Sequence, residues 1–233
     1  MHRSIGELII SYMALLLAIS VHECSHAWTA NRLGDPTAKN LGRVTLNPIA
    51  HIDLIGTVIL PLFIIISGSN FLFGWAKPVP VNPYNLRNQR KGNLWVSFSG
   101  PLSNMALAVI AAVFYHLFSF IPRAFFFSPE ANSILNPLML IIILTIQLNI
   151  ILAVFNLVPV FPLDGSGILM GLLPAEKAIL FEKTKPYGFL ILLFLLYTGV
   201  LGTILGPVYY IFIRLIKNQV LPVAYSWHKL YSK

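Results

Sequence analysis

Long apolar runs, separated by short polar or proline-rich stretches, dominate the hydropathy pattern of this chain. Four runs reach the roughly 20 apolar residues that a membrane-spanning helix needs. They cover residues 5–29, 94–121, 134–158 and about 187–214. A fifth run, residues 53–68, is shorter and contains Pro61, which favours a tilted or incomplete span. The pattern predicts an all-α polytopic membrane protein with about five to six transmembrane segments.

Composition agrees with this class of protein. Of the 233 residues, 57% are hydrophobic and only 10% are charged, which excludes a soluble globular domain. The formal net charge of +8 comes from Lys and Arg that punctuate the apolar runs. Such charges suit loops beside anionic membrane lipid, and they form no single basic face for nucleic acid. The single cysteine excludes an intrachain disulfide.

The chain divides into three regions by this pattern. Residues 1–175 form the expected core, residues 176–216 a loop and the last transmembrane helix, and residues 217–233 a basic interfacial tail. The first apolar run lacks a small-residue cleavage site, so we interpret it as retained and not as a signal peptide. Residues 37–51 are polar and predict a short hairpin or ordered loop at the membrane surface, near the active site.

A His-Glu-x-x-His motif lies at the end of the first apolar run, at residues 22–26. On a helix His22 and His26 are about 40° apart around the axis, so both imidazoles can reach one metal ion. Glu23 is turned roughly 100° from His22 and can meet a metal-bound water. The alternative is two interfacial histidines beside a glutamate. In an apolar segment such a group is costly unless it faces a protein interior, which favours the metal site.

A catalytic zinc site usually has three protein ligands, so the two histidines need a partner. Asp164 is the best candidate. It follows Pro159 and Pro162, which break the preceding helix, and Gly165 permits a tight turn. The alternative is that Asp164 only caps the short helix that begins there. Beside the histidine motif we favour the ligand.

With these residues in view, the sequence resembles the site-2 protease family of intramembrane zinc metalloproteases, in its compact bacterial or archaeal branch without PDZ or nucleotide-sensing domain. The matching stretches are HECSHAW at 22–28, GDPTAKNLGRVTLNPIAHID at 34–53, GWAKPVPVNP at 74–83, SGPLSN at 99–104 and NLVPVFPLDG at 156–165. The resemblance implies that His22, His26 and Asp164 bind one catalytic zinc and that Glu23 is the catalytic base. It also implies cleavage of transmembrane protein substrates in a prokaryotic cell membrane.

The proposed ligand set constrains the topology. Simple alternation of spans would place the histidines and Asp164 on opposite sides of a hydrocarbon core about 30 Å thick. One zinc ion with bonds near 2 Å cannot bridge that distance. We therefore predict that residues 52–93 leave and return to the same side as a re-entrant segment that packs near the site. Most Lys and Arg fall on the histidine side, which indicates that the active site faces the cytoplasm.

Three polar residues are candidates for stabilising the oxyanion or for supporting the ligands: Asn156, His51 and Asn104. Asn149 and Asn156 are seven residues apart and share a helix face. Asn104 is equally suited to hydrogen bonding between helices, and His51 with Asp53 to clamping its loop. An extended substrate could add as a strand to the proline-rich residues 74–82.

Two other functions remain as alternatives. A zinc or ion transporter would also carry intramembrane His, Glu and Asp, but it should show paired halves, and the chain shows no such symmetry. A non-catalytic membrane scaffold would not need to keep Glu23 with all three expected ligands. The expected partners are a transmembrane substrate and membrane lipid, and the pattern predicts no oligomeric state.

Overall fold

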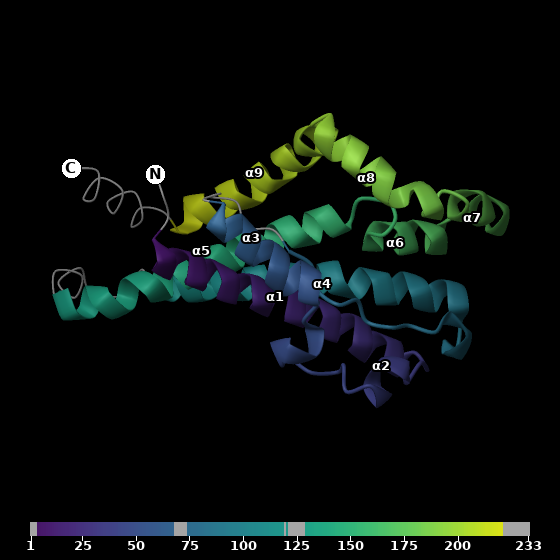
Figure 1. The fold of residues 1–233 in the computed structure, drawn as a ribbon, viewed down its shortest axis with the longest axis horizontal. Coiled ribbons are helices and arrows are strands. Elements are labelled where there is room, and N and C mark those ends of the chain that lie inside the picture. Colours follow the sequence, from purple (N-terminus) through teal and green to yellow (C-terminus); the bar gives the residue numbers. More distant parts are fainter. Residues whose placement is uncertain (1–3, 68–73, 119, 121–128, 221–233) are drawn as a thin grey trace.

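The computed structural model describes residues 4–67, 74–118, 120 and 129–220 (Figure 1). All regular structure in these residues is helical, as predicted. The α-helices are α1 (Ile5–Arg32), α2 (Thr37–Asn40), α3 (Leu60–Ile66), α4 (Gln89–Phe118), α5 (Pro129–Asn156), α6 (Asp164–Leu172), α7 (Ala175–Glu182), α8 (Gly188–Tyr197) and α9 (Val200–Val220). The short helices are π-helical Leu54–Ile59 and 3-10 helical Pro48–His51, Pro83–Asn85 and Lys185–Tyr187.

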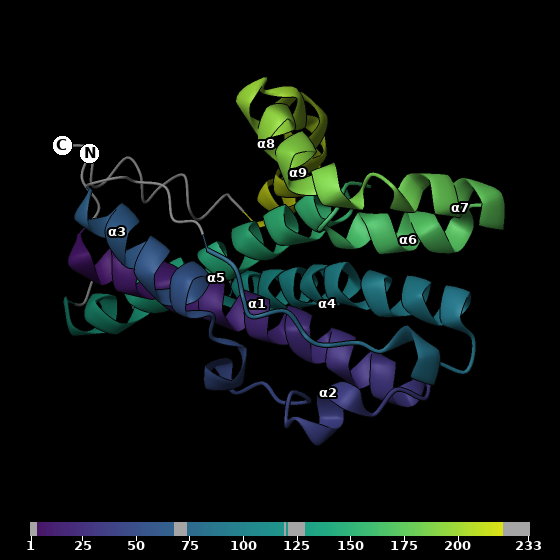
Figure 2. The ribbon, with the colours of Figure 1, turned by 45° about the vertical axis from the view of Figure 1, so that its right-hand side comes forward.

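Helices α1, α4 and α5 form the framework of the molecule and lie side by side (Figures 1 and 2). Ser4 starts α1 with a capping box, in which its hydroxyl accepts from the Glu7 amide and the Glu7 carboxylate accepts from the Ser4 amide. Small residues such as Ala108 and Ala111 let α4 approach α5 closely, where Ile150 is fully buried. These two helices therefore provide the largest cluster of buried apolar side chains among the described residues.

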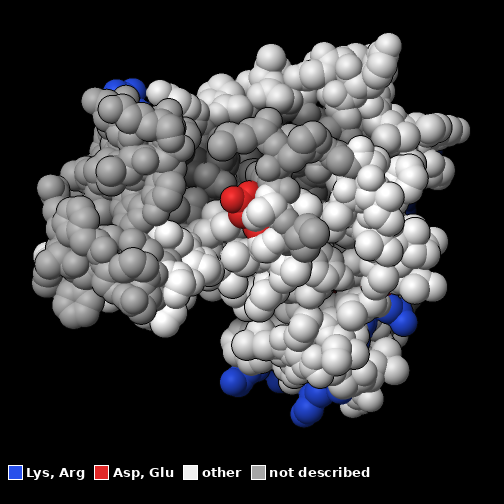
Figure 3. All heavy atoms as spheres, turned by 60° about the vertical axis from the view of Figure 1, so that its left-hand side comes forward, with Lys and Arg blue, Asp and Glu red and all other residues white. Residues whose placement is uncertain are grey.

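Helix α1 has the pattern of a helix that meets lipid on one side. Ala14 and Ala18 are buried against the neighbouring helices, whereas the larger Ile9, Met13 and Leu17 are exposed at four-residue spacing. Figure 3 shows a broad uncharged surface that one acidic group interrupts, with Lys and Arg side chains mainly toward its lower edge. Large apolar side chains on the outside and small ones inside are expected when the surrounding solvent is hydrocarbon. The chain is a membrane protein.

The described residues contain three helices that are long and apolar enough to cross a membrane: Gly6–Arg32, Gln89–Phe118 and Ser133–Asn156. A fourth span is possible if Ala175–Tyr197 and Val200–Ile211, which are bent by 72°, count as one. This is fewer than the five to six predicted. The predicted last span, residues 187–214, is broken at Gly199, whose φ of +73° ends α8 in a left-handed conformation.

Residues 37–51 do not form the predicted hairpin, because helix α2 and the Pro48–His51 turn occupy most of this segment. Buried Asp35 accepts hydrogen bonds from the amide and the hydroxyl of Thr37, the first residue of α2, and Asn47 accepts one from the Ile49 amide. Side chains satisfy the backbone donors that a ladder would otherwise pair. No strand is present in the described part of the chain, and the ordered-loop alternative holds.

The chain between α1 and α4 folds back along α1. Apolar helix Leu54–Ile66 is shorter than the three candidate spans. Residues 74–82, without helix or strand, then run beside α1 in the direction of its C-terminal end (Figure 2). Three amides mark the path: Trp75 donates to Gly56, Val79 to Glu23 and Asn82 to Asp35. Most of the predicted basic tail, residues 221–233, lies outside the described residues.

Candidate metal centre

Three predicted ligands meet in one cluster, in which both histidines are buried and Asp164 is half-buried. His22 and His26 come from α1 and Asp164 is the first residue of α6, and their ligating atoms all lie within 4.8 Å of one another. Nε2 of His22 is 3.1 Å from Asp164 Oδ2, and Nε2 of His26 is 3.4 Å from Asp164 Oδ1. The two Nε2 atoms are 3.1 Å apart. The fold thus unites residues that are about 140 positions apart in sequence.

The other ring nitrogens of the two histidines are held by protein oxygens. Nδ1 of His22 lies 2.5 Å from Asn104 Oδ1, and Nδ1 of His26 lies 2.7 Å from the Val96 carbonyl. Both oxygens only accept hydrogen bonds, so each histidine carries its proton on Nδ1. In the neutral form of each ring the Nε2 lone pair then faces Asp164, which is the arrangement found in metal-binding histidines.

The cluster fits a zinc ion. Ligand atoms at about 2.0–2.1 Å from a tetrahedral zinc lie roughly 3.3–3.4 Å apart, close to the separations between the Nε2 and Oδ atoms. Two nitrogen lone pairs and a carboxylate at such distances repel one another unless a cation lies between them. Oδ2 of Asp164 is buried and has no hydrogen-bond partner. The donor set of two imidazoles and one carboxylate is typical of catalytic zinc.

Helix α6 brings Asp164 to the histidines by packing closely on α4. A Cβ atom on Gly167 would overlap Ser97, and one on Gly171 would lie 2.5 Å from the Leu94 Cβ. Arg90, near the start of α4, donates to the carbonyls of the last residues of α6 and of Leu173, which follows it. Sequence reasoning missed these contacts, because a glycine spacing alone does not identify the facing helix.

The capping alternative for Asp164 is wrong in this structure. The N-cap of α6 is Leu163, and no side-chain hydrogen bond caps the helix. Gly165 also differs from its expected role, since it lacks the positive φ of a tight turn. A Cβ there would instead overlap the carbonyl oxygens of Leu157 and Val158. Glycine is needed for this close backbone approach beside the carboxylate.

Gly100 on α4 is a site residue that the sequence reasoning did not single out. A Cβ at this position would lie 2.5 Å from His26 Nε2 and 2.6 Å from His22 Cε1. Any larger residue would therefore displace the two imidazoles. The stretch SGPLSN contained the signal, but its meaning depends on how α4 packs on α1.

Glu23 lies beside the cluster without belonging to it. Its carboxylate oxygen Oε2 accepts a hydrogen bond of 2.9 Å from the Val79 amide, which belongs to the segment that runs along α1. The metal-binding group contains the two histidines and Asp164 only. The role of Glu23 as the catalytic base stays a prediction.

Asn104 lies at the site, between three helices. It is fully buried, and its Nδ2 donates to the Ala18 carbonyl and to Asn149 Oδ1 while its Oδ1 faces His22. Asn149 in turn donates to the Thr145 carbonyl. This network supports the interhelical alternative for Asn104 and orients a histidine at the same time.

The structure places Asn156 and His51 in other contacts. Asn156 donates to the Leu152 carbonyl of its own helix. His51 is buried, with Nε2 at 2.9 Å from the Thr45 carbonyl. Its own carbonyl accepts the Lys77 amide, so His51 links its loop to the 74–82 segment. Asp53 accepts from the Ile55 and Gly56 amides at the start of the next helix.

A buried His–His–Asp donor set beside a glutamate, between helices of a membrane protein, defines a membrane metalloenzyme site. Residues 128–199, which include Asp164, match Peptidase family M50. "Putative zinc metalloprotease YwhC" of Bacillus subtilis is 36% identical over 198 residues, which are 84% of this chain and 83% of that protein. "Putative zinc metalloprotease Rip2" of Mycolicibacterium smegmatis is 30% identical over 198 residues, covering 85% and 70% of the two chains. No solved structure matches the chain.

The chain belongs to peptidase family M50, the zinc metallopeptidases that resemble site-2 protease. Zinc is accordingly its cofactor, and His22, His26 and Asp164 form a cluster that could bind it. The similarity to these relatives and the geometry of the cluster support the same enzyme class.

Proposed function

We propose that this protein is an intramembrane protease that hydrolyses peptide bonds in or near the transmembrane segments of membrane proteins. The observation that carries the proposal is the position of the cluster. His22 and His26 belong to Gly6–Arg32, a candidate membrane span, and both are buried beneath neighbouring helices. A peptide bond that reaches this cluster must therefore come from a segment within or beside the membrane.

His22, His26 and Asp164 would hold the zinc through Nε2, Nε2 and a carboxylate oxygen. When bound, zinc supplies a Lewis acid that polarises the carbonyl and brings the pKa of its water toward neutrality. Glu23 accepts the proton of the attacking water at its carboxylate and returns it to the leaving amine. Asn104 and the Val96 carbonyl keep the two imidazoles in the tautomer that the ligand role needs.

Asn156 is the candidate donor that would stabilise the oxyanion. It ends α5, shortly before Asp164 in the chain. Its Nδ2 donates to the Leu152 carbonyl, and a change of rotamer would free this donor for a substrate oxyanion. Asn104 is fully engaged with His22, Ala18 and Asn149, which favours a positioning role.

A re-entrant path for residues 52–93 would let the histidines and Asp164 share one membrane side. Backbone hydrogen bonds support this path: the Trp75 amide donates to Gly56, the Val79 amide to Glu23 on α1, and the Asn82 amide to Asp35 just after α1. An extended substrate could lie beside residues 74–82. Because Pro78 and Pro80 carry no N–H, it would pair with this segment mainly by donating its own amides to carbonyl oxygens.

Charge favours a cytoplasmic active site in the cell membrane of a prokaryote. Basic residues concentrate around the C-terminal end of α1 and the start of α4: Arg32, Lys39, Arg43, Arg87, Arg90 and Lys91. Cytoplasmic loops carry such an excess of Lys and Arg. The related proteins come from bacteria, which agrees with this location.

The function is tested with the purified protein in detergent or liposomes and a set of single-span membrane proteins. Wild-type protein should cleave at least one of them, and Glu23→Gln should abolish cleavage while zinc stays bound. Glutamine keeps the size of the side chain but cannot accept the proton. Cleavage by Glu23→Gln at the wild-type rate would contradict the proposal, and so would zinc transport by the wild type without any cleavage.

A further inference from the structure

Among the described residues, one backbone amide donates to the Glu23 carboxylate. Oε2 accepts the Val79 N–H at 2.9 Å, and the donor belongs to a segment 56 residues further along the chain. A glutamate side chain has several rotatable bonds, and a hydrogen bond to its charged form is stronger than one between neutral groups. Fixing one carboxylate oxygen leaves the other, Oε1, in a defined position. The contact therefore sets where a proton can be accepted.

The local sequence isolates this amide. Val79 lies between Pro78 and Pro80, neither of which has an N–H, so residues 78–80 offer one donor only. The ring of each proline fixes its own φ, and Pro80 also restricts Val79 to extended conformations. Residues 78–80 are therefore conformationally restricted and have a single N–H group, that of Val79.

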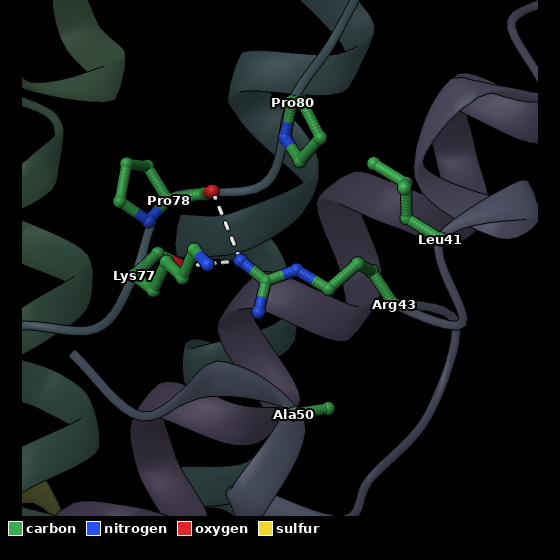
Figure 4. Close-up of a pocket in the computed structure, with 6 residues that line it drawn as sticks. All are labelled: Leu41, Arg43, Ala50, Lys77, Pro78 and Pro80. Carbon is green, nitrogen blue, oxygen red and sulfur yellow. Dashed lines mark hydrogen bonds between the residues drawn. The ribbon is translucent and has the colours of Figure 1, made fainter.

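The Arg43 side chain binds the backbone of this segment (Figure 4). One guanidinium nitrogen donates to the Lys77 carbonyl at 3.0 Å and to the Pro78 carbonyl at 3.1 Å. Arg43 is only 7% exposed and forms no ion pair among the described residues. A buried charge is tolerated when hydrogen bonds satisfy it, and here those bonds go to the two residues before Val79.

Packing alone does not fix the segment on the Arg43 side. A cavity of about 380 Å³ lies there, lined by Leu41, Arg43, Ala50, Lys77, Pro78 and Pro80. The Lys77 amide donates to the His51 carbonyl and the Asn82 amide to Asp35, which fastens the segment before and after Val79. Between these two points the position of the Val79 amide depends on Arg43.

We propose that the Val79 amide and Arg43 are positioning groups for Glu23 in the hydrolysis proposed above, on which this inference rests. Among the described residues, no hydrogen bond joins either group to a metal ligand: the Nδ1 atoms of the histidines lie against Asn104 and Val96, and Asp164 faces the histidines. Loss of the amide should therefore slow the chemical step and leave zinc binding intact.

The sharpest test compares Val79→Pro with Val79→Ala. Both variants lose the valine side chain, but only proline removes the N–H, and three consecutive prolines keep the extended backbone. We expect kcat of Val79→Pro to be on the order of 10- to 100-fold below that of Val79→Ala, since small misplacements of catalytic groups have effects of this size. KM and the zinc content should be the same in both variants.

Arg43→Met gives a second, independent test. Methionine retains an unbranched apolar stem but donates no hydrogen bond to the Lys77 and Pro78 carbonyls. We expect a decrease in kcat in the same direction as for Val79→Pro. Because both changes act through one contact, the double variant should be no slower than about the slower single variant.

The outcomes separate this inference from the proposed function. Equal kcat for Val79→Pro and Val79→Ala would overturn the inference, provided that wild type cleaves and Glu23→Gln does not. Loss of zinc from Val79→Pro would also overturn it, because the segment would then support the metal site itself. Unimpaired cleavage by Glu23→Gln would instead overturn the proposed function, and the inference with it.

Discussion

Gly100 of α4 touches His26 of α1 so closely that a Cβ would lie 2.5 Å from the Nε2 atom that faces Asp164. The absence of a side chain at this position is therefore part of the metal site. It lets α4 cover both imidazoles and bring its Asn104 and Val96 oxygens to their Nδ1 atoms.

Gly100→Ala should weaken zinc binding. The added methyl group has no space beside the imidazoles, so α4 must shift or the histidines must turn away. We expect zinc affinity to fall by about 10-fold or more, comparable to the loss of a supporting contact. Competition with a chelator measures this change. Gly202→Ala in α9 is the matched control, since its Cβ meets nothing within 4 Å, and it should keep wild-type affinity.

Substitutions at Asn104 should separate its two roles. Asn104→Ala removes the oxygen that holds His22 and leaves the Ala18 carbonyl and Asn149 without their donor. Zinc affinity should fall about 10- to 100-fold, as is typical when a supporting contact of a ligand is lost. Asn104→Asp keeps an oxygen for His22, so it should bind zinc more tightly than Asn104→Ala. Equal zinc affinity in the two variants would show that the oxygen does not orient His22.

Asp35 should make stability depend on pH. Burial by itself raises its pKa, but hydrogen bonds from Thr37, Asn85 and Asn82 outweigh this and hold the pKa below its usual value. The Asp35 carboxylate therefore binds a proton less readily in the folded state than in the unfolded chain, where the pKa of an aspartate is about 3.9. The resulting stabilisation is present above that pH and is lost as pH falls through the lowered pKa.

The measurement is the thermal unfolding of wild type and Asp35→Asn in detergent between pH 7 and pH 3. Wild type should be more stable at neutral pH, and the difference should shrink at the acid end of this range. A difference that stays constant down to pH 3 would show that the Asp35 carboxylate does not supply this stabilisation.

The sequence could predict those parts of the site that depend on residues close together in the chain. His22 and His26 are one helical turn apart, so their common face followed from periodicity. The place of Asp164 depended on reading the preceding prolines as a break in α5, and the structure brings it to the histidines. Gly100 and Val79 act through contacts between distant segments, which no periodicity reveals.

The errors have physical causes as well. Of the two structures predicted for residues 37–51, the hairpin is wrong and the ordered loop holds, because the Asp35 and Asn47 side chains accept hydrogen bonds from backbone amides two residues further on. The described residues contain fewer candidate spans than predicted, in part because hydropathy does not register the 72° bend of the last apolar run at Gly199. In both places one or two polar or flexible residues outweigh a pattern that extends over many residues.

The central claim is that one zinc ion is held jointly by α1 and α6, and zinc content after dialysis against a weak chelator tests it most directly. Wild type should retain one zinc per chain, whereas Asp164→Ala should lose it, because two histidines alone leave the site one protein ligand short. Ser166→Ala, two residues along the same helix, should retain zinc. Zinc retention by Asp164→Ala equal to that of wild type would contradict the account.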